Sequence, residues 1–477
     1  MTNIDQMIDD AMRPLTEAVT SVVFYSVPVL GANLPLIVMW LVAGGIFFTI
    51  YLRFVNFSGF RQAIRIVRGT YARPSDPGEI SQFQALTTAV SGTVGIANIA
   101  GVAVAISMGG PGAAFWLIVA GLLGMSTKCA ECTLGVLYRR THSDGSVSGG
   151  PMYYLERGLS DHHSPRLGRA LGAFYAAAMV VGCLGIGNMF QSNQAAAIFI
   201  DVTGGPASFF ANKVWLVGAM LAIAVGMVII GGIKSIANTT SKLVPFMAVL
   251  YIVSALIVLS FNAHAVPGAF VAIWNGAFTP EGITGGMIGA LIIGFRRAVF
   301  SNEAGLGSAA IAHSTARTTF PASEGYVALL EPFIDTIVIC TITALVIITT
   351  VYEPSLAAAE VSGIELTTRA FASTLSWSPV PLSIAAILFA YSTMIAWSYY
   401  GLKAFTYLVG EKRVADIGFK IVFCLFVVLG SSMQLGALVD LSDALVFIIA
   451  IPNLAGLYLL APIVKKEIAR YERSLRE

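Results

Sequence analysis

Hydroxyl and amide side chains interrupt two stretches of sequence that are otherwise apolar enough to cross a bilayer. The first stretch, residues 83–107, holds Ser91, Thr93 and Asn98 in its middle, together with three glycines. Lipid offers no hydrogen-bond partners, so these groups and any non-helical backbone beside them must line a cavity within the protein. Carbonyls and amides released by such a break are typical ligands of ions and small substrates. A continuous helix whose glycines permit close packing is the alternative.

The second interrupted stretch covers residues 283–315. Its central polar residues are Arg296, Arg297, Ser301, Asn302 and Glu303. Charges at this depth are expensive unless they pair or face water. Glu331 and Asp335 are candidate partners for the arginines, and Glu131 is a further acid that could serve this polar centre. The alternative is a short span that ends at residue 295 and continues as a loop. It would change the number of spans and spoil the charge distribution described below.

Two other apolar segments carry ligand-type side chains. Ser392 and Thr393 are adjacent hydroxyls within residues 380–409, and Trp397 follows one helical turn later. Oxygen ligands suit a small hard cation, whereas transition metals favour His or Cys. A Ser-Thr pair in a helix also often bonds back to the carbonyl four residues earlier.

Amide side chains recur every three residues in the segment 170–200, at Asn188, Gln191 and Gln194. This spacing predicts that they share one helix face. They are candidate ligands, or hydrogen-bond links between helices.

The composition predicts an all-α polytopic membrane protein. Of its 477 residues, 56% are hydrophobic and 11% are charged, against about 25% charged residues in soluble domains. Mean hydropathy is +0.79. The five cysteines fall in apolar segments and are interpreted as small buried hydrophobes. Eleven transmembrane helices are predicted, near residues 34–54, 83–107, 112–138, 170–200, 213–232, 241–262, 283–315, 325–352, 380–409, 416–437 and 441–463.

Basic residues concentrate in alternate connections between these helices. The connection 53–73 and the next one on the same side, 139–169, are each rich in arginine, and so is the carboxyl-terminal tail. Cytoplasmic loops carry the excess of Lys and Arg. The amino terminus is therefore predicted outside and the carboxyl terminus in the cytoplasm.

The two interrupted stretches occupy matching positions in the chain. Each begins a block of five expected spans, residues 83–262 and 283–463, and the two blocks have opposite orientation in the membrane. This is the five-plus-five inverted repeat typical of secondary transporters, whose substrate binds where the two broken helices meet. Residues 1–82 then supply an extracellular segment, the first helix and a basic cytoplasmic connection, and residues 464–477 form a basic cytoplasmic tail. Asn98 and Ser301 are predicted substrate contacts from the two breaks.

Other classes of protein fit less well. A membrane-embedded enzyme would need a nucleophile–base or metal constellation, and the spans contain no HExxH, GxSxG or His/Asp cluster. An ion channel would more naturally assemble shorter chains around a shared pore. A proton-coupled symporter is the closest rival, with Glu303 or Glu131 as the titratable group. The sequence indicates no nucleic-acid partner and leaves the oligomeric state open.

Four motifs carry a resemblance to a known family. They are SGTVGIANIAG (91–101), GNMFQ (187–191), FSNEAGLGSA (300–309) and WSYYG (397–401). Together they resemble the alanine or glycine:cation symporter family over almost the whole chain. The resemblance implies a prokaryotic plasma-membrane protein with a leucine-transporter-like core. It also implies uptake of a small neutral amino acid with Na⁺ as the coupling ion and without an organic cofactor.

The resemblance also implies a set of site residues. Sodium would bind the carbonyls of Ser91, Val94 and Phe389 and the hydroxyls of Ser392 and Thr393. The substrate carboxylate would meet the backbone of Thr93, Gly95, Ile96 and Ala97, with the free amides of the interrupted helix near Ile96 and Ala97. Gln191 and Trp397 would bound the substrate pocket, unless Trp397 only packs between helices.

Three alanines depart from the usual family pattern. Ala97, Ala298 and Ala396 stand where glycine is commoner, and each adds a methyl group at or beside the expected pocket. This favours glycine or alanine as the substrate over glutamine, although the alanines could also act through packing alone.

Overall fold

The computed structural model describes residues 4–29, 32–73, 75–162, 164–278, 286–353, 363–433 and 435–476, and this part of the chain is almost entirely helical. The α-helices are α1 (Ile4–Val23), α2 (Leu36–Tyr51), α3 (Val55–Ser58), α4 (Phe60–Val67), α5 (Gln82–Thr93), α6 (Ala100–Gly109), α7 (Gly112–Leu137), α8 (Pro151–His162), α9 (Pro165–Leu184), α10 (Phe190–Val202), α11 (Val214–Ile229), α12 (Gly232–Phe261), α13 (Val266–Phe278), α14 (Gly286–Asn302), α15 (Ser308–His313), α16 (Pro321–Ala328), α17 (Leu330–Pro332), α18 (Thr341–Thr350), α19 (Gly363–Ala372), α20 (Pro379–Val409), α21 (Arg413–Ser432) and α22 (Leu435–Ser474). Short 3₁₀ segments are η1 (Ile96–Asn98), η3 (Gly205–Ala207) and η4 (Ala263–Ala265), and π-helices are η2 (Gly185–Met189) and η5 (Phe333–Cys340). Two antiparallel hairpins complete the described elements, β1 (Ser26–Val29) with β2 (Ala32–Pro35) and β3 (Arg140–Thr141) with β4 (Val147–Ser148).

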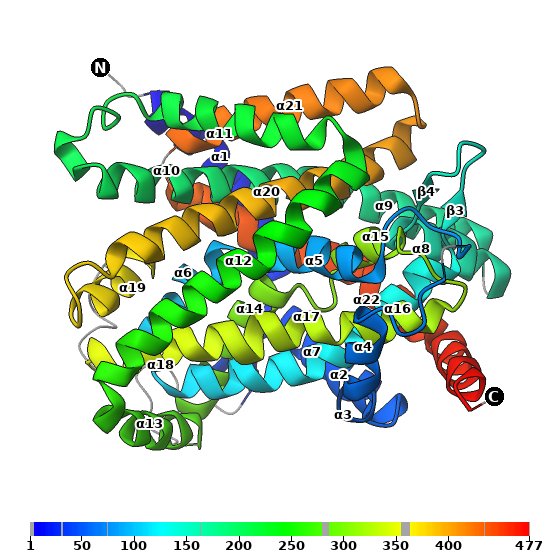
Figure 1. Ribbon diagram of the computed structural model, residues 1–477, viewed down its shortest axis with the longest axis horizontal. Coiled ribbons are helices and arrows are strands. Elements are labelled where there is room, and N and C mark those ends of the chain that lie inside the picture. Colours follow the sequence, from blue (N-terminus) through cyan, green and yellow to red (C-terminus); the bar gives the residue numbers. More distant parts are fainter. Residues whose placement is uncertain are drawn as a thin grey trace.

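Long helices run across the whole molecule and pack around a common interior (Figure 1). Every segment expected to span the membrane contains helix in the structure. Within the described residues, seven helices are long and apolar enough to cross a membrane, or eight if the bent pair α5–α6 is one span. The apolar helices α2 and α11 are shorter. The prediction of an all-α polytopic membrane protein is confirmed, and the number of eleven spans stays a prediction.

The first interrupted stretch is a broken helix, as expected. Helix α5 begins at a capping box in which the Ser81 hydroxyl accepts from the backbone N–H of Gln84. It ends at Thr93, and its axis is bent by 63° from that of η1 and α6. The intervening Gly95 is fully extended (φ −135°, ψ −161°). The alternative of one continuous helix is therefore wrong.

The second interrupted stretch is broken between α14 and α15. The connecting residues include three with positive φ, namely Glu303 (57°), Gly305 (94°) and Gly307 (75°). Glycine adopts this conformation without the steric penalty of a Cβ atom. Residues 298–316 are buried throughout, which rules out the alternative that this stretch leaves the interior as a surface loop.

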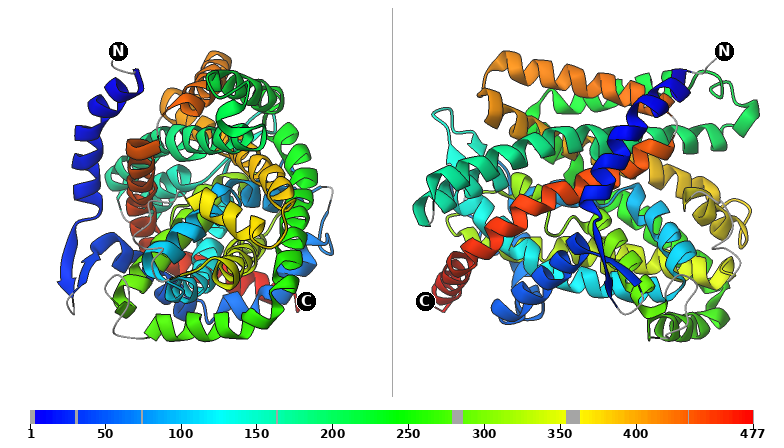
Figure 2. Two further views of the ribbon diagram at one scale, coloured as in Figure 1. Left: turned by 90° about the vertical axis from the view of Figure 1, so that its left-hand side faces the viewer. Right: turned by 180° about the vertical axis from the view of Figure 1, so that it is seen from behind.

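The basic connections gather at one end of the molecule. In Figure 1, α4, α8, the β3–β4 hairpin, α16 and the carboxyl terminus all lie toward the right, whereas α13 and α19 lie toward the left. Helix α1 packs on the outside and crosses α22, as the rear view in Figure 2 shows. This arrangement puts the arginine-rich connections on one side, as the charge pattern predicts. Which side faces the cytoplasm stays a prediction.

Two π-helices lie beside the breaks. η2 packs against α20 and η5 packs against α5, η1 and α14. A π-helix inserts an extra residue into a helical turn and is frequent at functional sites. Both segments therefore mark the region between the broken helices as the place to look for a site.

Candidate functional site

The hydroxyls of α20 meet the carbonyls of the first break. Thr393 Oγ1 donates to the carbonyl of Ser91, at 3.1 Å, and to that of Phe389 on its own helix, at 3.0 Å. Ser392 Oγ also donates to the Phe389 carbonyl (3.0 Å), and Ser91 Oγ donates to the Ser392 carbonyl (2.7 Å). Four of the five predicted sodium ligands therefore lie together at the junction of α5 and α20.

This cluster has the chemistry of a hard-cation site. Its contacting atoms are all hydroxyl or carbonyl oxygens, and Ser91, Ser392 and Thr393 are buried. The fifth predicted ligand, Val94, is the C-cap residue that follows α5, with an extended ψ of 93°. Its carbonyl is released from the helical pattern, and its role as an ion ligand stays a prediction.

Gly95 lies beside both Thr393 of the hydroxyl cluster and Gln191 of the predicted substrate pocket. A Cβ atom at Gly95 would stand 2.8 Å from Thr393 Oγ1 and 3.4 Å from Gln191 Oε1. Only glycine permits this approach of three helices. Gln191 is 3% exposed, and its Oε1 atom has no hydrogen-bond partner among the residues that the structure describes. A buried amide oxygen without a donor is costly, and the role of Gln191 as a substrate contact stays a prediction.

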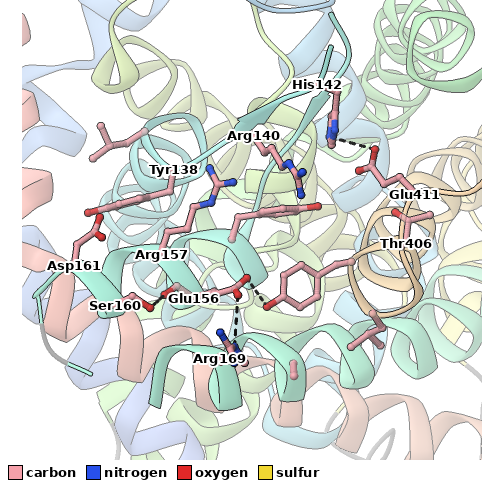
Figure 3. Close-up of a pocket in the computed structure, with 16 residues that line it drawn as sticks. Tyr138, Arg140, His142, Glu156, Arg157, Ser160, Asp161, Arg169, Thr406 and Glu411 are labelled. Carbon is pink, nitrogen blue, oxygen red and sulfur yellow. Dashed lines mark hydrogen bonds and ion pairs between the residues drawn. The ribbon is translucent and has the colours of Figure 1, made fainter. Parts of the chain in front are cut away.

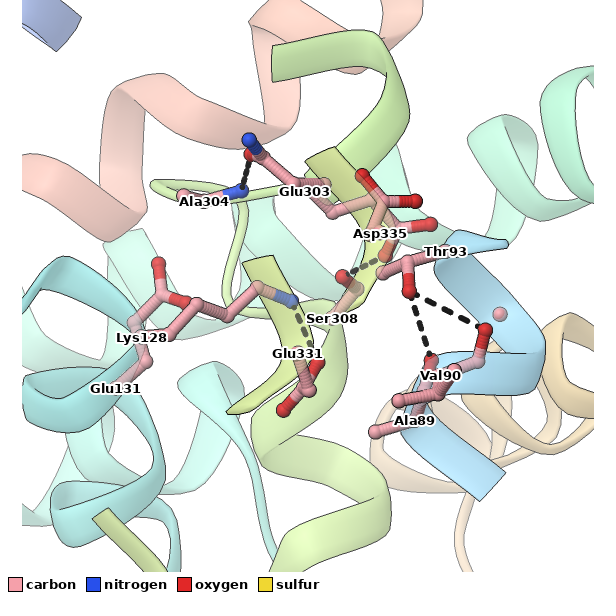
Figure 4. Close-up of polar contacts among 12 residues, drawn as sticks. Ala89, Val90, Thr93, Lys128, Glu131, Glu303, Ala304, Ser308, Glu331 and Asp335 are labelled. Carbon is pink, nitrogen blue, oxygen red and sulfur yellow. Dashed lines mark hydrogen bonds and ion pairs between the residues drawn. The ribbon is translucent and has the colours of Figure 1, made fainter. Parts of the chain in front are cut away.

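The backbone of the first break offers donors close by. The N–H of Gly95 bonds to Asn98 Oδ1, that of Asn98 to the Gly95 carbonyl, and that of Ile99 to the Ile96 carbonyl. Among the described residues, the structure shows no acceptor for the N–H groups of Ile96 and Ala97. These are the two amides predicted to bind a carboxylate. The Thr93 hydroxyl donates back to the carbonyls of its own helix (Figure 4).

Trp397 connects the two breaks. Its Nε1 donates to the Gly92 carbonyl in the first break (3.2 Å) and to Glu303 Oε1 in the second (3.1 Å). The ring is 1% exposed, and a Cβ atom at Gly187 would lie 2.3 Å from it. The glycine in η2 is therefore required for the indole to fit. Because Nε1 is hydrogen-bonded and Gly187 lies against the ring at Cγ and Cδ2, Trp397 has a fixed position in the interior.

Asn98 and Ser301 meet as predicted, but they do so around a third residue, Asp335. Asn98 Nδ2 donates to Ser301 Oγ (3.0 Å) and to Asp335 Oδ1 (2.6 Å), while Ser301 Oγ donates to Asp335 Oδ2 (2.8 Å). All three are fully or almost fully buried. Their assignment as direct substrate contacts stays a prediction, because their polar atoms are already paired with one another.

The second break is held by Glu131, as the sequence suggested. Glu131 Oε1, on α7, accepts from the backbone N–H groups of Gly305 (2.9 Å) and Gly307 (3.1 Å) and from Asn453 Nδ2 (2.8 Å). The side chain of Glu303 receives the hydroxyl of Ser308 as well as the Trp397 indole. Figure 4 shows these carboxylates from different helices converging on the break.

A row of buried charges runs away from the break. Lys128 Nζ lies 3.1 Å from Glu331 Oε2, His313 Nε2 lies 2.7 Å from Glu331 Oε1, and His313 Nδ1 lies 2.6 Å from Glu324 Oε2. The expectation that Glu331 or Asp335 pairs with Arg296 or Arg297 is wrong, because closer partners on α7, α14 and α15 occupy both carboxylates.

The arginines of α14 lie against aromatic rings. The Arg296 guanidinium is 4.2 Å from the centre of the Phe24 ring, and that of Arg297 is 5.9 Å from the centre of the Phe300 ring. Such cation–π contacts lower the cost of a charge at membrane depth.

The three amides of residues 188–194 do not act together. Asn188 Nδ2 donates to the Phe423 carbonyl of α21, at 2.7 Å, and Gln194 Nε2 contacts its neighbour Asn193. Gln191 faces Gly95 instead. Asn188 belongs to the π-helix η2, whereas Gln191 and Gln194 belong to the regular helix α10. The shared face of Gln191 and Gln194 stays a prediction. Asn188 is a link between helices.

A separate cavity of about 1040 Å³ opens at the end of the molecule that carries the basic connections (Figure 3). Its lining includes Arg140, Arg157 and Glu411, with His142 Nε2 3.2 Å from Glu411 Oε2. Burial raises the pKa of Tyr153 in its wall to about 12. None of the predicted site residues lines this cavity, so it is distinct from the region between the breaks.

A family model decides the identity of the chain. The model of the sodium:alanine symporter family matches residues 17–477. The chain belongs to this family. The symporter is therefore a multi-pass membrane transporter of the amino acid–cation symport class and not an enzyme, as the sequence predicted.

Individual relatives agree with this assignment. The symporter is 40% identical over 434 residues to the sodium/alanine symporter AgcS of Methanococcus maripaludis, which covers 91% of this chain and 93% of that protein. It is 33% identical to the probable sodium/glutamine symporter GlnT of Bacillus subtilis, over 92% of this chain and 88% of that protein.

The fold also has a solved counterpart. The crystal structure of MhsT in complex with L-phenylalanine matches with a TM-score of 0.58 at 16% identity, covering 80% of this chain and 89% of that one. At this identity the match concerns the fold alone. It confirms the predicted leucine-transporter-like architecture of the symporter.

Some features of the site were absent from the sequence predictions. The His313–Glu324 contact joins residues that are eleven apart, and an isolated His in an apolar segment carries no sign of it. The close approach of Trp397 to Gly187 was not predicted either. Its signal was the repeated glycine at 185 and 187, which marks a place where a large side chain approaches the backbone.

Proposed function

We propose that this symporter couples the uptake of glycine or alanine to sodium, with the ion and the amino acid bound next to one another beside Gly95. The observation that carries the proposal is the juxtaposition at this residue. The Thr393 hydroxyl with its carbonyl partners and the Oε1 atom of Gln191, which has no hydrogen-bond partner among the described residues, both lie close to the position that a Cβ atom of residue 95 would take. The names of the relatives AgcS and GlnT support sodium as the coupling ion.

Sodium would be held by the carbonyls of Ser91, Val94 and Phe389 and by the hydroxyls of Ser392 and Thr393. Two of these carbonyls already accept from the Thr393 hydroxyl. An ion at their meeting point would take over the carbonyl lone pairs, and the hydroxyl would turn its own oxygen toward it. Because ligands come from both α5 and α20, bound sodium would fix the first break in one geometry.

The amino acid would bind through both of its charged groups. Its carboxylate would accept from the N–H groups of Ile96 and Ala97, the first two residues of η1. Its ammonium group would donate to Gln191 Oε1. Sodium thus orders the break whose amides bind the substrate, which supplies a physical basis for coupling the two.

The expected substrate is small because the pocket region is crowded. Trp397 is held in place by Gly92 and Glu303 and fills the space next to the hydroxyl cluster. Ala97, Ala298 and Ala396, where glycine is commoner in the family, are all buried. Added methyl groups in a closed interior favour glycine or alanine over glutamine.

Alternating access would use the two breaks. We propose that residues 83–262 and 283–463 are inverted repeats, that residues 1–82 precede them, and that the tail 464–477 is cytoplasmic. The amino terminus would lie outside in a prokaryotic plasma membrane. The gathering of basic connections at one end of the molecule supports this topology. All predicted site side chains are buried, as in a conformation closed to both sides.

Uptake into proteoliposomes tests the proposal. Labelled glycine, alanine and glutamine would be offered in turn under an imposed sodium, potassium or proton gradient. Uptake of glycine or alanine driven by sodium alone supports the proposal. Uptake driven by a proton gradient without sodium would favour the rival in which Glu303 or Glu131 carries the coupling proton. Glutamine as the preferred substrate would overturn the size argument and leave sodium coupling intact.

A further inference from the structure

An apolar groove of about 620 Å³ runs between α11 and α21, which lie side by side at the edge of the molecule (Figures 1 and 2). Small residues spaced to share one face of α11 line it, namely Ala219, Ala222 and Gly226. Large apolar side chains that are between 47% and 74% exposed line it as well, namely Ile223, Ile230, Ile417, Ile421 and Leu425. The α11–α21 groove is therefore an open apolar channel on the membrane-facing surface.

Charged side chains line the α11–α21 groove at one end only. Arg413 and Asp416 lie in the first turn of α21, and Lys420 Nζ is 2.8 Å from Asp416 Oδ2. No hydrogen bond or ion pair among the described residues includes the Arg413 side chain, so this end has a net positive charge. Glu411, two residues earlier, lines the cavity of Figure 3 among the basic connections. The charged end of the groove thus lies at the basic end of the molecule.

The dimensions of the groove fit one hydrocarbon chain and exclude a helix. Its lining on α21 extends from Arg413 to Val428, roughly 22 Å at 1.5 Å per residue. A volume of about 620 Å³ over that length leaves a mean cross-section of roughly 28 Å². A helix of 10–12 Å diameter occupies roughly 80–110 Å². A helix from a second copy of this chain is therefore too wide for the groove, whereas a flexible acyl chain can follow it.

We propose that the α11–α21 groove binds an anionic phospholipid. An acyl chain lies along the apolar length, and the phosphate binds Arg413 and Lys420 at the charged end. Basic pockets between transmembrane helices are typical sites for anionic headgroups, and guanidinium and ammonium groups form charge-assisted hydrogen bonds to phosphate. Asp416 is already bonded to Lys420, so the charge left for the headgroup is that of Arg413. None of the predicted sodium or substrate residues lies on α11 or α21, so this site does not depend on the proposed function.

Filling the groove tests the position of the acyl chain. A Cβ atom at Gly226 would contact only Cys424 Sγ, at 3.6 Å, so Gly226→Leu adds a side chain to the groove without displacing backbone. Gly418→Leu on α21 is the matched control, because a Cβ atom there meets open space and Gly418 does not line the groove. Native mass spectrometry of the purified full chain, titrated with phosphatidylglycerol, measures binding without sodium or amino acid.

We expect Gly226→Leu to weaken the tightest binding step by about tenfold or more, since this is the effect of displacing about two methylene groups. Gly418→Leu should bind as the unaltered protein does. Equal affinities in the two variants would show non-specific lipid contact only and would overturn the proposal. A dimer that dissociates in Gly226→Leu alone would assign the groove to a second copy of the chain and would also overturn it.

The headgroup is tested by comparing phosphatidylglycerol with phosphatidylcholine that carries the same acyl chains. The unaltered protein should prefer phosphatidylglycerol. Arg413→Gln, at an exposed side chain, should lower the affinity for phosphatidylglycerol by about fivefold, the contribution of one basic residue beside an anionic lipid surface. Lys466→Gln, at an exposed lysine of α22, is the control and should keep the preference. Equal binding of the two lipids by the unaltered protein, or an unchanged preference in Arg413→Gln, would overturn the assignment of an anionic headgroup to this end.

Discussion

Two buried hydroxyls of α20, those of Thr393 and Ser398, differ in what they can bind. Thr393 Oγ1 donates to the carbonyl of Ser91 on another helix as well as to its own helix, whereas Ser398 Oγ donates only to the Ile395 carbonyl (2.7 Å). Only the first hydroxyl stands where two chain segments present oxygen atoms. Whether a hydroxyl can act as an ion ligand therefore depends on the groups around it. Ser398, which bonds only to its own helix, is the matched control for Thr393.

Thr393→Ala is expected to raise the sodium concentration for half-maximal uptake by about ten- to hundredfold. The physical reason is the loss of one buried ligand, worth roughly 1.5–3 kcal/mol, at a factor of ten per about 1.4 kcal/mol. The measurement is uptake as a function of sodium. Ser398→Ala should behave as the unaltered protein. An unchanged sodium dependence in Thr393→Ala and in Ser392→Ala would remove the ion from this site.

Trp397→Phe and Trp397→Leu are expected to admit bulkier neutral amino acids. The indole is wedged against Gly187 and anchored by Gly92 and Glu303, so shrinking it opens space next to the proposed pocket. Competition between labelled alanine and larger neutral amino acids measures the effect. Trp377→Phe, at an exposed ring, is the control. If the variants lose activity and keep the same substrate ranking, Trp397 is scaffold only.

At the scale of elements, a polar side chain holds each broken helix open. In the first break this side chain comes from the far end of the break, and in the second it comes from another helix. In the first break, Asn98 Oδ1 accepts from Gly95 N; in the second, Glu131 Oε1 accepts from Gly305 N and Gly307 N. These acceptors replace the carbonyls that a continuous helix would have supplied. The breaks are thus specified by polar side chains as well as by glycine.

Glu131→Ala is expected to lower the free energy of unfolding by roughly 2–6 kcal/mol, because two buried amides lose their acceptor at about 1–3 kcal/mol each. Denaturant or thermal unfolding in detergent measures the change. Glu131→Gln keeps a carbonyl oxygen that can accept the same bonds, so it should retain more stability than Ala. Equal losses in the two variants would show that the charge matters and the hydrogen bonds to the break do not.

At the scale of the whole molecule, the direction of charge movement follows from the cargo. A zwitterionic amino acid that moves inward with one sodium ion carries one net positive charge. A potential of 100 mV contributes about 2.3 kcal/mol per charge, or roughly 50-fold in accumulation at tenfold per 1.4 kcal/mol.

A negative-inside potential is therefore expected to speed uptake and to raise the final accumulation. Potassium diffusion potentials imposed with valinomycin across proteoliposome membranes provide the measurement, at constant sodium gradient. Uptake that is indifferent to the potential would point to exchange or to a compensating counter-ion, and would contradict transport with one uncompensated sodium ion.

The sequence by itself determined that the chain is a polytopic helical transporter with two broken helices. Hydrophobic length, glycine and isolated polar groups are local properties, and at membrane depth they leave few alternatives because lipid satisfies no backbone group. The same local chemistry singled out Ser91, Ser392 and Thr393 as polar groups within apolar spans and connected Glu131 with the second break. The grouping of Ser91, Phe389, Ser392 and Thr393 in one site came from the resemblance to the family.

Only the tertiary structure decided which polar groups meet. Arg296 and Arg297 pack on aromatic rings, while Glu331 pairs with Lys128 and His313. Asn188, in the π-helix η2, donates to α21, whereas Gln191, in α10, faces Gly95. Partner choice depends on the distance and angle between helices that are far apart in the chain, and spacing along a single helix carries no information about either.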